Sequence, residues 1–121
     1  MKHCMVIDDS SSIRKVARRI LEDMSFQTSE ADTHQAALDA CRSNMPDCIV
    51  VDWRMPDGED LEFLQTLRKL PEGHKPTVVY LTSENDQIQV ARAKRCGADA
   101  HMMKPFDRDS IKRSFASAGL I

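Results

Sequence analysis

Five polar side chains of this 121-residue chain come directly after short apolar runs. They are Asp8 and Asp9 after residues 3–7, Asp52 after residues 48–51, Thr82 after residues 77–81, and Lys104 after residues 100–103. A carboxylate at the end of an apolar run is costly unless a cation, a metal or water meets it. Carboxylates that cluster repel one another unless a cation joins them, and a hard divalent ion such as Mg²⁺ prefers their oxygen atoms.

If these side chains meet, their chemistry fits phosphoryl transfer. A lysine and a hydroxyl beside a metal ion would hold phosphoryl oxygens. The remaining carboxylate would then be the nucleophile and would form an acyl phosphate.

Each residue also has a purely structural interpretation. Asp9 could precede a helix cap and Thr82 could cap the following helix, while Lys104 could be a solvated side chain. Asp52 could be a turn-forming aspartate. These interpretations stay open residue by residue, but the way the five chemistries fit together favours a shared site.

The elements that would position these residues alternate between two apolar periods. Strands are predicted at residues 3–7, 26–31, 48–51, 77–81 and 100–103, and helices at residues 13–24, 34–44, 63–70, 88–97 and 111–118. Ser10 and Ser11 are candidate N-caps of the first helix. Strands that alternate with helices predict an α/β fold, a parallel sheet covered on both faces. Ligands bind outside the carboxyl ends of such strands, where the five polar side chains would converge.

The composition sets limits on the class of protein. Residues 1–121 are predicted to form one domain, with 41% hydrophobic and 30% charged residues and a net charge of -2. This balance does not suggest disorder or a broad basic face for nucleic acid. The four cysteines contain no CxxC pair and are interpreted as buried free thiols. Asp8-Asp9 interrupts the N-terminal apolar run, and no segment reaches the roughly 20 apolar residues of a membrane span, so we expect a cytoplasmic protein.

Four motifs occur in order along the chain: VIDDS from Val6, VVDWRMP from Val50, YLTSE from Tyr80 and MMKPF from Met102. Together they resemble the receiver domain of bacterial two-component response regulators, above all the stand-alone, chemotaxis-type regulators. The resemblance covers essentially the whole chain. It implies a flavodoxin-like (βα)5 fold, a doubly wound parallel five-stranded sheet with the strand order 2-1-3-4-5.

The same resemblance implies roles for individual residues. Asp52 would be the phosphoacceptor, and Mg²⁺ would be bound by Asp8, Asp9, Asp52 and the main-chain carbonyl of Arg54. Thr82, with Ser83 beside it, would bind the phosphoryl group and shift inward. Lys104 would pair with a phosphoryl oxygen, after which a cis peptide leads to Pro105.

By this resemblance the protein is not an enzyme but a single-domain response regulator. It would take a phosphoryl group from a histidine kinase or a phosphotransfer protein and act as a monomer, without binding nucleic acid or inserting into a membrane. It would then bind a downstream target through the fourth helix, fifth strand and fifth helix, in chemotaxis or motility control. A phosphorelay shuttle or phosphate sink is the alternative. A Mg²⁺-dependent phosphohydrolase of the haloacid dehalogenase type is disfavoured, because it needs an aspartate where Arg54 stands.

Several positions depart from the family pattern. Asp57-Gly58 comes two residues earlier than usual, so either the left-handed residue has moved or Asp60 tolerates that conformation. His101 stands where an aromatic switch residue is usual, and it could swing or stay exposed and inert. Arg54 and Glu84 flank the expected path of water to the phosphoryl group. They could form an ion pair that shields it, or Arg54 could assist hydrolysis.

Overall fold

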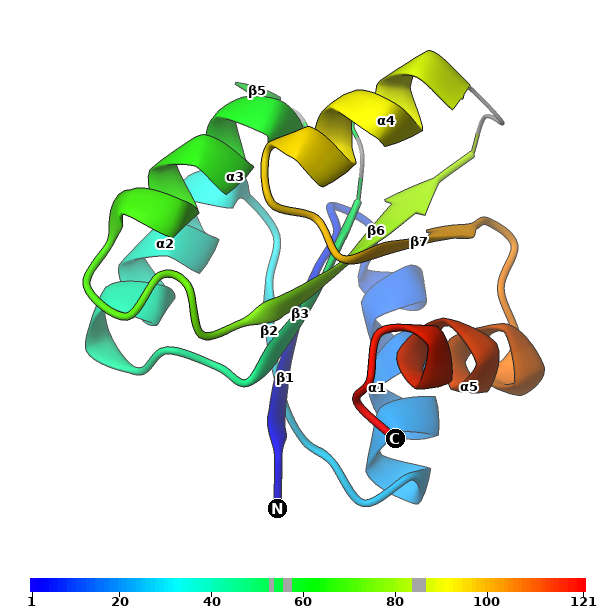
Figure 1. Cartoon of the computed structure of the whole chain (residues 1–121). Helices are drawn as coiled ribbons and strands as arrows, with labels where there is room; N and C mark the ends of the chain where they lie inside the picture. The colour runs from blue at the N-terminus through cyan, green and yellow to red at the C-terminus, as the bar shows by residue number, and fades with distance from the viewer. Residues whose placement is uncertain (53, 56–57, 84–86) are drawn as a thin grey trace.

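The computed structural model describes residues 1–52, 54–55, 58–83 and 87–121. These residues form five long helices and a central sheet (Figure 1). The strands are β1 (His3–Ile7), β2 (Gln27–Ala31), β3 (Cys48–Asp52), β4 (Arg54–Met55), β5 (Gly58–Glu59), β6 (Thr77–Thr82) and β7 (Ala100–Met103). The helices are α1 (Ser11–Asp23), α2 (His34–Ser43), α3 (Asp60–Lys69), α4 (Gln87–Arg95) and α5 (Arg108–Ser117).

The main sheet has five parallel strands in the order β2-β1-β3-β6-β7. This is the predicted order 2-1-3-4-5, once the small strands β4 and β5 are set aside. The register aligns Ile7 with Val51, Asp52 with Leu81, and Thr82 with Met103. The carboxyl ends of four strands therefore lie at one edge of the sheet, which confirms that the polar residues after them share one side of the molecule.

Helices cover both faces of the sheet. In Figure 1, α2, α3 and α4 lie on one side of it, and α1 and α5 lie on the other. Alternate residues of each central strand serve the two layers: Met5 and Ile7 of β1 pack toward one core, whereas Cys4 and Val6 pack toward the other. Because the central strands are buried on both faces, their sequences are continuous apolar runs rather than alternating ones.

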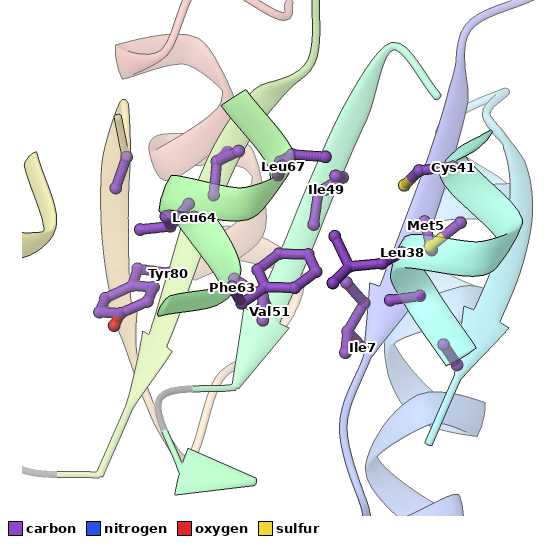
Figure 2. Close-up of a cluster of buried hydrophobic side chains, with 14 of the residues drawn as sticks. Met5, Ile7, Leu38, Cys41, Ile49, Val51, Phe63, Leu64, Leu67 and Tyr80 are labelled. Carbon is purple, nitrogen blue, oxygen red and sulfur yellow. The ribbon is translucent and has the colours of Figure 1, made fainter. Parts of the chain in front are cut away.

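The larger core joins the strands to α2 and α3. Figure 2 shows Ile7 and Val51 facing Leu38 of α2 and Phe63 of α3, and Leu64 is fully buried beside them. Burying an aliphatic or aromatic side chain of this size contributes roughly 1.5–3 kcal/mol. This packing fixes the position of β3 in the sheet, and therefore the position of Asp52 at the end of that strand.

The helix starts are set by short polar side chains. Ser10 is the N-cap of α1, because its hydroxyl accepts a hydrogen bond from the Ile13 amide, and Ser11 is already helical. Thr33 caps α2 in the same way through the Ala36 amide. Asp107 forms a capping box with Ser110 at the start of α5.

The short antiparallel pair of β4 and β5 was not predicted, and α3 begins at Asp60 rather than near Phe63. The pairing places Arg54 opposite Glu59 and Met55 opposite Gly58. Pairing between segments this short depends on neighbours that periodicity does not report. Asp57 lies outside the described residues, so the interpretation of this turn stays a prediction.

Among the described residues, no helix is long and apolar enough to cross a membrane.

Candidate functional site

Asp8 is the most tightly held residue at the carboxyl edge of the sheet. Its amide donates to the carbonyl of Ala31 at 3.2 Å, and its Oδ1 accepts from the Ser10 amide at 2.9 Å. The side chain is completely buried. The turn between β1 and α1 therefore presents this carboxylate in one orientation, and Asp9 follows on the exposed side of the same turn.

Three carboxylates converge at this edge. One oxygen from each of Asp8, Asp9 and Asp52 lies within 4.8 Å of the other two. At an effective dielectric constant of about 20, two unit negative charges at such a distance repel by about 3–4 kcal/mol. The donor set contains only hard oxygen atoms, two of them on buried residues, and such a set fits Mg²⁺.

Lys104 supplies positive charge inside this cluster. Its Nζ lies 2.9 Å from Oδ2 of Asp8 and 3.2 Å from Oδ2 of Asp52. Burial favours the neutral amine, but the two carboxylates outweigh it and raise the pKa of Lys104 above its ordinary value. The cis peptide predicted before Pro105 is present. The lysine thus bridges the ends of β1 and β3 from the loop that follows β7.

Comparison with known proteins supports the interpretation drawn from the sequence motifs. The family described as the response regulator receiver domain matches residues 4–116. The chain belongs to the receiver domain family of response regulators.

Curated relatives of this receiver domain include the chemotaxis protein CheY-3 of Vibrio cholerae. It is 29% identical over 109 residues, which cover 89% of this chain and 84% of that protein. The phosphate regulon transcriptional regulatory protein PhoB of Klebsiella pneumoniae is 30% identical over 105 residues. That match covers 87% of this chain but 46% of PhoB, so the chain spans about half the length of this relative.

Solved structures agree on the fold. The chemotaxis response regulator CheY4 of Vibrio cholerae superimposes with a TM-score of 0.90 at 25% sequence identity, over 98% of both chains. The receiver domain described here is therefore homologous to CheY proteins. Receiver domains interact with histidine kinases and with downstream targets, and they bind Mg²⁺ at an acidic pocket such as the one formed by Asp8, Asp9 and Asp52.

Three other predicted receiver residues, Thr82, Ser83 and His101, lie on β6 and β7 or directly after β6. Thr82 ends β6 and is buried, and its carbonyl accepts from the Lys104 amide at 2.8 Å. Ser83 follows and is exposed. His101 is half-buried on β7 opposite Tyr80, and burial together with the nearby charge of Lys94 lowers its pKa. Both effects favour the neutral imidazole.

Two predictions lie partly or wholly outside the described residues. Arg54 belongs to β4, two residues past Asp52, but its side chain is not among those described, and neither is Glu84. The proposed ion pair between them, and the role of the Arg54 carbonyl as a metal ligand, stay predictions.

One side chain at this edge was missed. Arg14 of α1 donates from Nη1 to the main-chain carbonyl of Asp8 at 2.7 Å. The one sequence signal for this contact is that Arg14 lies about one helical turn after the DDS segment. An arginine on a helix is normally interpreted as a solvated residue, so this signal was not used.

Proposed function

We propose that the chain is a single-domain response regulator that accepts a phosphoryl group on Asp52 with the help of Mg²⁺. The observation that carries this proposal is the meeting of three carboxylates and one lysine at the carboxyl edge of the sheet. Such a carboxylate cluster suits a divalent metal ion, and an ammonium group beside that metal can pair with a phosphoryl oxygen.

Asp52 is the best nucleophile of the three carboxylates. In Asp8, Oδ1 accepts a hydrogen bond from the Ser10 amide, Oδ2 forms an ion pair with Lys104, and the side chain is completely buried. Asp9 is exposed, which suits a ligand that water can also reach. Asp52 ends the central strand, retains 8% exposure, and touches Lys104, the group that would meet a phosphoryl oxygen.

In the proposed transfer an oxygen of Asp52 attacks phosphorus, and the bond from phosphorus to the donor nitrogen of a phosphohistidine breaks. The imidazole leaves with the electron pair and takes up a proton, and an acyl phosphate remains on Asp52. Asp8, Asp9 and Asp52 would hold Mg²⁺, which when bound supplies positive charge that stabilises the phosphoryl oxygens. Lys104 pairs with one phosphoryl oxygen, and the hydroxyl of Thr82, which follows the register partner of Asp52 on the neighbouring strand β6, binds another.

The output follows from the added charge. Phosphorylation adds roughly 1.5 to 2 negative charges at the end of β3. The proposed target face is formed by α4, β7 and α5, where Ile88 and Met103 are exposed apolar residues. Thr82 is the register partner of Met103, so an inward shift of Thr82 would directly affect the position of β7. Chemotaxis control fits the CheY relatives, and transfer of the group to a further protein is the alternative output.

The test is incubation with acetyl phosphate in the presence and absence of Mg²⁺, followed by intact-protein mass spectrometry. The parent is expected to take up one base-labile phosphoryl group that depends on Mg²⁺, and Asp52→Asn is expected to take up none. Asp39→Asn, at an exposed aspartate of α2, is the matched control and should behave as the parent. Uptake by Asp52→Asn at the parental rate would show that another residue is the acceptor.

A further inference from the structure

Arg14 connects three parts of the molecule around the acidic pocket. Its Nη1 donates to the Asp8 carbonyl at 2.7 Å, and its Nε donates to Oε1 of Glu30 at 2.8 Å. Its side chain is only 14% exposed although it lies on α1. The guanidinium thus ties the helix and the edge strand β2 to the turn that carries the metal-binding carboxylates.

The partner of Arg14 on β2 is itself held in place. Glu30 also forms an ion pair with Arg18, one helical turn further along α1. Arg18 reaches Thr28 and Glu22 as well, but no bond from it to Asp8 occurs among the described contacts. Of the two arginines that share Glu30, Arg14 is therefore the one that touches the pocket.

The carbonyl that Arg14 holds belongs to the peptide unit between Asp8 and Asp9. A peptide unit is planar, so fixing the direction of its oxygen also fixes the orientation of the bond that leads into Asp9. The Asp8 side chain is already held by Ser10 and Lys104. Arg14 restrains the peptide that leads into the exposed Asp9, one carboxylate oxygen of which lies within 4.8 Å of the other two.

We propose that Arg14 is a positioning residue of the acidic pocket, which holds the Asp8-Asp9 peptide in the orientation that binds Mg²⁺ without contacting the metal or the phosphoryl group. This inference rests on the metal site of the proposed function. Groups that orient metal ligands from outside the coordination sphere commonly change metal affinity by about 10–100-fold when they are removed.

The test measures the Mg²⁺ dissociation constant by isothermal titration calorimetry together with unfolding by urea. Arg14→Gln is expected to weaken Mg²⁺ binding at least about tenfold. Arg18→Gln is the matched control, since it also loses an ion pair with Glu30 on the same helix, and it should bind Mg²⁺ within about twofold of the parent. Equal weakening in both variants, or parental affinity in Arg14→Gln, would overturn the proposal.

Arg14→Lys separates geometry from charge and serves as the second variant if Arg14→Gln does not fold. A lysine keeps the positive charge but cannot bond Glu30 and the Asp8 carbonyl through two fixed nitrogen atoms. It should remain several-fold weaker than the parent in Mg²⁺ affinity, and full recovery would show that charge alone acts there. If the parent binds Mg²⁺ but is not phosphorylated on Asp52, the proposed function fails while the role of Arg14 can still be decided.

Discussion

At the scale of single residues, Lys104 has a second role beside the one its motif suggests. Resemblance to the family assigns it to a phosphoryl oxygen, but in the structure it also forms ion pairs with Asp8 and Asp52. The lysine therefore balances the carboxylates whenever no phosphoryl group is present. A buried carboxylate left without its cation is costly, because water cannot replace the lost partner.

Lys104→Met is expected to lower the free energy of unfolding by about 1–3 kcal/mol in metal-free buffer. The physical reason is that the completely buried carboxylate of Asp8 loses its ammonium partner. Added Mg²⁺ should stabilise this variant more than the parent, since the metal ion then replaces the positive charge that the lysine no longer supplies. Urea unfolding with EDTA and with excess Mg²⁺ measures both effects. Equal stabilisation of variant and parent by Mg²⁺ would contradict this role.

At the scale of elements, Arg68 of α3 joins loops at the opposite edge of the sheet. Its Nη1 donates to the carbonyls of Gly73 and Pro76 at 3.0 and 2.8 Å, and its Nη2 donates to the carbonyl of Gly97. Gly97 has a φ of 118°, and an added Cβ there would come within 2.7 Å of the Arg68 Nε. The glycine is needed both for its backbone conformation and for the close approach of this side chain.

Arg68→Lys is expected to destabilise the protein by about 1–3 kcal/mol, because an ammonium group cannot serve three carbonyls in different directions. The side chain is 16% exposed, so water can replace only part of what is lost. Arg92→Lys, at an exposed position of α4, is the control and should stay within about 0.5 kcal/mol of the parent. Urea unfolding measures the stability of both variants. Equal unfolding midpoints for Arg68→Lys and the parent would contradict this role of Arg68.

At the scale of the whole molecule, stability in acid depends on carboxylates spread over the surface. The hydrogen bonds and charges of Arg14 and Arg18 lower the pKa of Glu30. Asp47, just before β3, has a lowered pKa because the His3 amide donates to its carboxylate. A native pKa below the ordinary value means that the unfolded chain binds the proton more readily, so stability falls as the pH falls.

Glu30→Gln should therefore flatten the acid side of the pH–stability curve. The stabilisation from Glu30 is fully present above its ordinary pKa of 4.5 and is lost as the pH falls through its lower native pKa. The variant is expected to be less stable than the parent at pH 7, with the difference shrinking below pH of about 4. Thermal unfolding across this range measures it, with Glu62→Gln at an exposed site of α3 as the control. A constant difference at all pH values would contradict the ion-pair origin.

Local pattern predicted most of the fold. The bounds of β1 and β7 were predicted as the structure has them, and the other main strands differ by one residue at one end. Strands buried on both faces are easily predicted from sequence, because short apolar, β-branched runs seldom occur in other kinds of structure. The residues at the carboxyl ends of these strands, Asp8 just after β1 and Asp52 and Thr82 at the ends of β3 and β6, could be assigned to one edge because parallel strands share a direction.

Tertiary structure decided what depends on contacts between distant segments. The β4 and β5 pair, the bridge from Lys104 to two carboxylates, and the bond from Arg14 to the Asp8 carbonyl each join positions whose relation is not periodic. A side chain's type and spacing indicate which chemistry it can do. Which oxygen it reaches is set by the packing of helices on the sheet, because close packing fixes the positions of side chains and sequence pattern does not report them.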